Sequence, residues 1–213
     1  MIKAIIFDFD ETLVETFRIR SRALQECGKL HYGLDLTEAD IRSFWGLPFA
    51  EFIRRLYKTA EPDAEIIRKY FAVAQKYPLK LFPGVKELLL DLAKQYKLAI
   101  VSASSSELIN FDFYRFKLPK ATFFKIQGSE ATNFHKPDPR VFEPLLLELQ
   151  ELEITNDEVL YVGDSLSDLK AAQGVGFNFV PVVTGQTTAA EFRARGAVGL
   201  NKLTELPQYL SML

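Results

Sequence analysis

The sequence predicts an α/β fold in which a parallel sheet lies between layers of helices and carries an inserted, all-helical unit. Short apolar runs typical of buried strands recur at residues 5–7, 97–101, 122–126 and 159–162. Amphipathic helical patterns lie between the later runs, and strands that alternate with helices form parallel sheets covered on both faces. The insertion is predicted because strand-like runs are missing between about residues 15 and 81, where helical periodicity takes over.

Composition limits the class of protein and its partners. The 213 residues are 48% hydrophobic and 25% charged, which is ordinary for a globular protein. The net charge is −2 and the sequence has no basic block, so nucleic acid and anionic membranes are poor partners. Cys27 is the only cysteine, and no apolar run is long enough for a signal peptide or a membrane span. We expect a cytoplasmic monomer or homodimer that contacts no membrane.

The insertion contains several helices. After a strand and turn in residues 1–14, apolar residues recur with helical spacing, and Thr37 stands where it can cap a helix. Pro48 suits a first-turn position of the next helix. The apolar stripes are Phe17, Leu24 and Cys27; Phe49, Phe52, Ile53, Leu56 and Tyr57; and Ile66, Ile67, Tyr70, Phe71 and Ala74.

Helix and strand alternate again after a proline-bounded linker at residues 78–84. A helix is predicted over residues 85–96, and short helices are predicted over 189–195 and 203–210. Pro144 interrupts a helical pattern and predicts a kink or a late helix start there. Residues 177–183 predict a fifth strand, which Pro181 assigns to an edge of the sheet.

Polar side chains that could take part in catalysis or metal binding follow the predicted strands. Asp8 and Asp10 follow the first strand, and Ser102 follows the second. Lys136 lies in the loop after the third strand, and the fourth is followed by Asp164 and, four residues later, Asp168. Ligand sites of parallel α/β sheets lie at the carboxyl ends of strands, and burying carboxylates there is costly unless something pairs them. The pattern therefore predicts a metal site, a nucleophile, or both.

These four clusters, in this order, resemble the four motifs of the haloacid dehalogenase superfamily of phosphotransferases, and the resemblance spans nearly the whole chain. The helical insertion after the first motif resembles the phosphoglycolate phosphatase-like and β-phosphoglucomutase-like branches. The resemblance implies a Rossmann-like three-layer core in residues 1–15 and 82–213. It also implies an α-helical cap domain in residues 16–81 that closes over the core and excludes water.

The resemblance also implies catalytic roles. Asp8 would attack phosphorus and form an aspartyl phosphate, and Asp10 would act as general acid and then as general base. Dehalogenase members lack a carboxylate at the position of Asp10, so its presence favours phosphoryl transfer. Ser102 and the following backbone amide, at Ala103, would bind the phosphoryl group, and Lys136 would offset the negative charge.

A cation is expected because several carboxylates in one pocket repel each other and the substrate. Family resemblance implies Mg²⁺, which prefers octahedral oxygen ligation. The ligands would be the Asp8 carboxylate, the Asp10 backbone carbonyl and the Asp164 carboxylate, with Asp168 acting directly or through water. Glu11 departs from the family pattern, since many relatives carry glycine there, and it adds negative charge beside the site.

The leading hypothesis is a Mg²⁺-dependent phosphatase for a small phosphorylated metabolite, with Trp45 and Gly46 as a substrate-contacting loop of the cap. A phosphomutase of the β-phosphoglucomutase type is an alternative, and so is a non-catalytic binding protein that retains the fold. The complete set of motif residues argues against the last. Each residue also has a simpler interpretation: Ser102 as a helix cap, Lys136 as a solvated side chain, and Asp168 as part of a capping box with Ser165.

Overall fold

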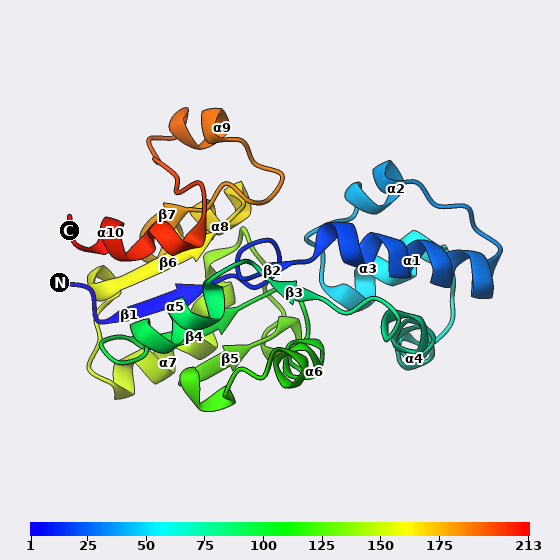
Figure 1. The fold of residues 1–213 in the computed structure, drawn as a ribbon, viewed down its shortest axis with the longest axis horizontal. Helices are drawn as coiled ribbons and strands as arrows, with labels where there is room; N and C mark the ends of the chain where they lie inside the picture. Colours follow the sequence, from blue (N-terminus) through cyan, green and yellow to red (C-terminus); the bar gives the residue numbers. More distant parts are fainter. The chain divides into compact units, whose positions relative to one another are not determined.

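The structure is a computed structural model that describes all residues from Met1 to Leu213. Its main sheet has five strands in the order β5-β4-β1-β6-β7 (Figure 1). All four strand pairs are parallel, which confirms the predicted α/β class. The strands are β1 Ala4–Phe7, β4 Lys97–Val101, β5 Lys125–Gln127, β6 Val159–Gly163 and β7 Asn178–Pro181.

Most predicted strands are confirmed, with one correction. The predicted strand 122–126 begins later, at Lys125, because Lys120–Thr122 form a 3₁₀ turn that follows the extended Pro119. The predicted strand near Pro181 is confirmed at the edge of the sheet, where a residue without an N–H is tolerated.

The chain falls into two compact units, one formed by Met1–Val14 together with Leu81–Leu213 and the other by Glu15–Lys80. Two short strands, β2 (Val14–Glu15) and β3 (Lys80–Leu81), pair where the chain passes from one unit to the other. The functional division into a core and a cap stays a prediction. No helix in either unit has the length and apolar character that crossing a membrane requires.

The first unit surrounds its sheet with helices. They are α5 Val85–Leu92, α6 Ser106–Phe116, α7 Glu143–Glu151, α8 Leu166–Val175, α9 Ala189–Arg193 and α10 Leu206–Leu210. Further 3₁₀ turns are Ser129–Ala131, Pro139–Phe142, Asn156–Glu158 and Leu203–Glu205. The late helix start predicted at Pro144 is confirmed, since α7 begins at Glu143 and Pro144 lies in its first turn.

The core of this unit lies on both faces of the sheet. All four residues of β1 are buried, as expected for the central strand of a covered parallel sheet. One face packs against α7 and α8, and Figure 1 shows α5 and α10 crossing the other. The cluster on the α7–α8 side contains Ala4, Ile6, Ala99, Val101, Val141, Phe142, Leu145, Leu149, Ile154, Val159, Tyr161, Ala171, Ala172 and Phe177.

The second unit is helical, as the periodicity predicts. Its helices are α1 Phe17–Tyr32, α2 Glu38–Arg42, α3 Phe49–Tyr57 and α4 Asp63–Ala74. The stripe from Phe49 to Tyr57 is buried, and Thr37 caps α2 in a capping box with Asp40. Pro48 is the N-cap of α3, one residue earlier than predicted. In the stripe of α4, Ile66 and Tyr70 are buried, whereas the other three predicted residues are half-buried.

Candidate active site

The candidate site lies at the carboxyl edge of the main sheet. Because β1 pairs with β4 on one side and with β6 on the other, the residues that follow these three strands come together. Asp8 follows β1, Ser102 follows β4 and Asp164 follows β6. The connections from β4 and from β6 lead to opposite sides of β1, which is the arrangement where ligands bind in open α/β sheets.

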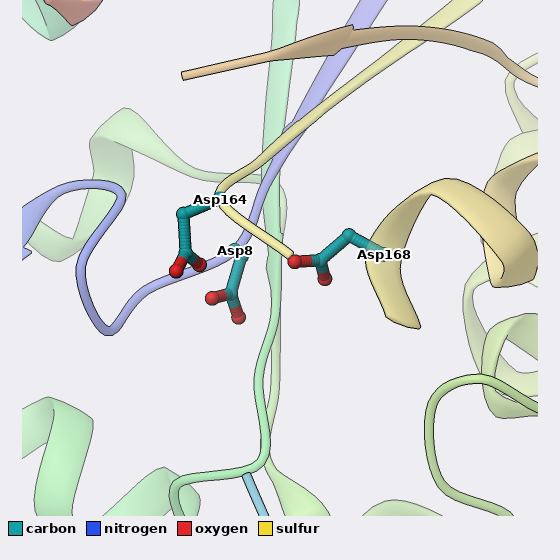
Figure 2. A group of neighbouring side chains, drawn as sticks. All are labelled: Asp8, Asp164 and Asp168. Atoms are coloured by element: carbon teal, nitrogen blue, oxygen red, sulfur yellow. The ribbon is translucent and has the colours of Figure 1, made fainter. Parts of the chain in front are cut away.

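Three carboxylates converge at this edge. Oxygen atoms of Asp8, Asp164 and Asp168 all lie within 4.8 Å of one another in a buried group (Figure 2). Asp168 reaches the group from the first turn of α8. Oxygen donors at this spacing match the ligands of hard divalent cations, so the group suits a divalent metal site.

Lys136 is the cation that faces these acids. Its Nζ donates to Asp8 Oδ1 at 2.7 Å and to Asp168 Oδ1 at 2.6 Å, and it lies 3.0 Å from the Tyr161 hydroxyl. Only 10% of the Lys136 side chain is exposed, so the interpretation of Lys136 as a solvated surface lysine is wrong. The structure thus places Lys136 against Asp8, across a sequence separation of 128 residues.

Burial and mutual repulsion shape the charge of the site. Burial raises the pKa of the Asp8 carboxyl to about 7, with Lys136 opposing the shift and Asp168 adding to it. Burial, followed by repulsion from Asp168 and Asp8, raises the pKa of Asp164 well above its usual range. Burial alone would lower the pKa of Lys136, but the carboxylates of Asp168 and Asp8 raise it well above the usual value. One lysine therefore leaves the acid group incompletely compensated, and a divalent cation would favour the ionised forms of Asp8 and Asp164.

Asp168 has a structural and a site-forming role at once. Ser165 caps α8 in a capping box with Asp168, which confirms that interpretation. Asp168 Oδ2 accepts from the Ser165 backbone N–H and hydroxyl, while Oδ1 lies at hydrogen-bond distance from Lys136 and Tyr161. A carboxylate has about four lone-pair positions, so these partners occupy most of its capacity. The arrangement favours Asp168 as the residue that holds Lys136 rather than as a direct metal ligand.

Asp10 lies in a tight turn that follows Asp8. The Glu11 backbone N–H donates to the Val14 carbonyl at 2.9 Å, and the Leu13 N–H donates to the Phe9 carbonyl at 3.0 Å. The Ser104 hydroxyl donates to Asp10 Oδ2 at 2.5 Å and fixes the carboxylate. Two residues after Asp8, the chain has therefore turned enough to give Asp10 a position distinct from that of Asp8.

Glu11 occupies this turn in a left-handed conformation, with φ of 58°. Such a backbone costs a side-chain-bearing residue roughly 1–2 kcal/mol, whereas glycine adopts it freely and loses about 0.5–1 kcal/mol to chain entropy. We expect Glu11→Gly to raise the free energy of unfolding by up to about 1 kcal/mol, as measured by urea denaturation. Lys170→Gly, in the exposed interior of α8, should instead lower it by about 1 kcal/mol. A loss at Glu11 as large as at Lys170 would contradict this account.

Ser102 is buried at the end of β4. Its backbone N–H donates to the Gln127 carbonyl at 3.0 Å, and its Oγ accepts from the Ser104 N–H at 3.0 Å. The interpretation of Ser102 as a helix cap is wrong, because Ser105 caps α6 by accepting from the Leu108 N–H. Ala103 lies between Ser102 and Ser104 and is half-buried.

Two residues of the site escaped the sequence analysis. Tyr161 lies within the apolar strand β6, and its hydroxyl is 3.0 Å from both Lys136 Nζ and Asp168 Oδ1. The available signal was a buried tyrosine, whose hydroxyl needs a polar partner. Ser104, which holds Asp10, stands in the run 102–106, where nothing in the sequence distinguishes it from its serine neighbours.

The predicted cap residues lie in the second unit. The Trp45 ring packs edge-on against Phe17, with ring centroids 4.9 Å apart, and against Phe52 at 5.8 Å. Gly46 adopts φ of 94°, a conformation that favours glycine. Trp45 is thus packed by its aromatic neighbours, whereas Gly46 is exposed, and a substrate contact by either residue stays a prediction.

Comparison with known proteins identifies the family. Residues 5–182 match the family described as Haloacid dehalogenase-like hydrolase. The chain belongs to this family. A phosphorylated carbohydrates phosphatase of Thermotoga maritima is 28% identical to this chain, and the alignment covers 96% of each of the two chains. A phosphoglycolate phosphatase of Nitrosospira multiformis is also 28% identical, and its alignment covers 82% of this chain and 80% of the relative. The solved structure of CbbY from Rhodobacter sphaeroides in complex with phosphate is 25% identical, with a TM-score of 0.78 over 97% of this chain and 96% of that one. The family resemblance predicted from the four motifs is confirmed.

Proposed function

We propose that this haloacid dehalogenase-like protein is a Mg²⁺-dependent phosphatase that hydrolyses a small phosphate monoester through an aspartyl phosphate on Asp8. The observation that carries the proposal is the position of the Asp8 carboxylate. It lies at the carboxyl end of the central strand, 2.7 Å from Lys136 Nζ and within the acid group that contains Asp164. Phosphatases among the relatives support the same enzyme class.

Asp8 and Asp10 would divide the chemistry between them. An Asp8 oxygen forms a bond to phosphorus while the bond from phosphorus to the leaving oxygen breaks, and Asp10 gives its proton to that oxygen. Asp10 then takes a proton from water, whose oxygen displaces Asp8 from phosphorus and releases inorganic phosphate. The Ser104 hydroxyl keeps the Asp10 carboxylate in place for both proton transfers.

Ser102 and Lys136 would bind the phosphoryl group. The Ser102 oxygen accepts from the Ser104 N–H, so the hydroxyl hydrogen can be donated to a phosphoryl oxygen. Lys136 already faces Asp8, where a transferring phosphoryl group would bring additional negative charge. The backbone amide of Ala103 follows Ser102 directly and is the nearest candidate for a further donor.

The acid group fits Mg²⁺ in its donor chemistry. Asp8 and Asp164 would hold the ion through carboxylate oxygens and Asp10 through its backbone carbonyl, whereas Asp168 would hold Lys136. When bound, the ion would neutralise charge on the phosphoryl oxygens and on the acids around them.

Small phosphorylated metabolites are the proposed substrates. The relatives include enzymes named for phosphoglycolate, for phosphorylated carbohydrates and for glyceraldehyde 3-phosphate. The second unit would act as the cap that contacts the part of the substrate beyond the phosphate, with Trp45 and Gly46 as contact candidates.

The direct test is phosphate release from a panel of phosphorylated metabolites in the presence of Mg²⁺. We expect release from several esters, with the highest kcat/KM for one chemical class, which would name the substrate. Release from no ester, together with isomerisation of a sugar phosphate, would replace the phosphatase with a phosphomutase. Activity of neither kind would contradict the proposal.

Metal removal gives a further prediction. Chelation of divalent cations should reduce phosphate release to background, and added Mg²⁺ should restore it, because the three acids would otherwise share a single lysine as counter-charge. A parallel thermal melt of the chelated protein checks that the fold survives. Undiminished turnover in excess chelator would contradict the metal site.

A further inference from the structure

The loop between β7 and α9, residues 182–188, runs beside the acid group although it carries none of the predicted catalytic residues. It leaves the sheet next to β6, where Pro181 stands opposite Gly163 and the Val182 N–H donates to the Gly163 carbonyl at 2.9 Å. Gly163 immediately precedes Asp164. The first residue of the loop is therefore hydrogen-bonded to the residue that directly precedes Asp164, a proposed metal ligand.

Gly185 of this loop leaves room for the Asp164 carboxylate. A Cβ atom added at Gly185 would lie 1.7 Å from Asp164 Oδ2 and 2.6 Å from its Cγ, distances that no side chain tolerates. The φ angle of Gly185 lies outside the left-handed region, so its backbone conformation does not demand glycine. The close approach to Asp164 is what requires it.

Thr184 connects the same loop to the turn that carries Asp10. Its hydroxyl donates to the Glu11 backbone carbonyl, and the next residue of that turn, Thr12, places its Oγ1 3.5 Å from Asp164 Oδ1. The Asp164 carboxylate is thus confined from two sides, with Thr12 beside one oxygen and Gly185 against the other.

We propose that Thr184 and Gly185 are positioning residues of the metal site: Gly185 leaves the space that lets the Asp164 carboxylate lie beside Asp8, and Thr184 links this loop to the turn of Asp10 and Glu11. The inference rests on the proposed Mg²⁺ site and extends it to a segment outside the four motifs. Residues that orient metal ligands change metal affinity by about 10- to 100-fold when they are replaced.

Mg²⁺ binding without substrate, measured by titration calorimetry, tests the proposal apart from turnover. In Gly185→Ala the added methyl group must push the Asp164 carboxylate away, so we expect the Kd for Mg²⁺ to rise at least about ten-fold. Gly199→Ala is the matched control, because its Cβ would meet Val183 at 2.9 Å and Pro181 at 3.3 Å in the same region without reaching the carboxylate. Its Kd should stay within about two-fold of wild type.

A second pair of variants decides the question even where Gly185→Ala does not fold. Thr184→Val removes the hydroxyl but keeps the shape, and it should weaken Mg²⁺ binding by about three-fold or more, whereas Thr184→Ser should retain wild-type affinity. If folded Gly185→Ala or Thr184→Val bound Mg²⁺ as tightly as the wild type does, the inference would be overturned. The proposed function would still stand in that case, provided that the wild type releases phosphate. A wild type that neither binds Mg²⁺ nor releases phosphate would overturn both.

Discussion

Asp8→Asn is expected to lower phosphate release at least about 10⁴-fold, the scale of loss when a catalytic nucleophile is removed. Asparagine keeps the size of the side chain and an oxygen that can accept from Lys136, but its amide does not attack phosphorus. The fold should survive, because burial already disfavours the charged form of Asp8, whose pKa is raised to about 7. We therefore expect the melting temperature of the metal-free variant to be no lower than that of the wild type.

The measurement is phosphate release in Mg²⁺ with the best ester of the panel, beside a thermal melt of each protein. Asp138→Asn is the matched control: Asp138 caps the 3₁₀ turn that begins at Pro139 and pairs with Arg140, in the same segment as Lys136 but outside the acid group. Its turnover should remain within a few-fold of wild type. Substantial turnover by Asp8→Asn would assign the nucleophile to another residue.

The sequence could predict where the acids meet because that follows from topology. Carboxyl ends of neighbouring parallel strands share one edge, so residues after the strands ending at Phe7, Val101 and Gly163 had to converge once the strands were recognised. Only the start of the third strand was misplaced: Thr122 ends a 3₁₀ turn, and the apolar Phe123 and Phe124 lie between this turn and β5, which begins at Lys125. Apolar character alone does not distinguish such a connection from a strand.

The sequence could not predict contacts that depend on side-chain direction and close approach. In the sequence Tyr161 looks like one more apolar position of a strand, and only the structure places its hydroxyl 3.0 Å from both Lys136 Nζ and Asp168 Oδ1. Gly185 reads as an ordinary loop glycine until its distance from Asp164 is known. For Asp168 the sequence offered a helix cap and a site residue as alternatives, yet its two oxygens serve both purposes at once.

Lys136→Met should destabilise the fold by about 3–5 kcal/mol at pH 8 and reduce phosphate release at least about 100-fold. Methionine retains an unbranched side chain of similar length but carries no charge. Asp8 and Asp168, which lie 2.7 and 2.6 Å from Lys136 Nζ, would then be left without their cation in a buried site. Urea denaturation of the metal-free proteins measures the stability, and phosphate release in Mg²⁺ measures the activity.

The loss of stability in Lys136→Met should grow as the pH rises. Lys136 holds down the pKa of Asp8, so its removal raises that pKa further above about 7, whereas the unfolded chain keeps an Asp pKa of about 3.9. An acid whose pKa is higher in the folded state stabilises the fold at low pH, and that stabilisation is lost as the pH rises toward the folded pKa. The deficit of the variant should therefore be smaller at pH 5 than at pH 8.

A second lysine separates this effect from the general cost of losing an ion pair. Lys125 pairs with Glu148 at 2.6 Å, but both side chains are partly exposed, so Lys125→Met should cost about 0–1 kcal/mol with little change between pH 5 and pH 8. If Lys136→Met were as stable as Lys125→Met at pH 8, the buried acids would not depend on Lys136 for compensation. A large, pH-dependent loss of stability in Lys136→Met, but not in Lys125→Met, would instead show that Lys136 is the cation that compensates the buried carboxylates of Asp8 and Asp168 in the folded protein.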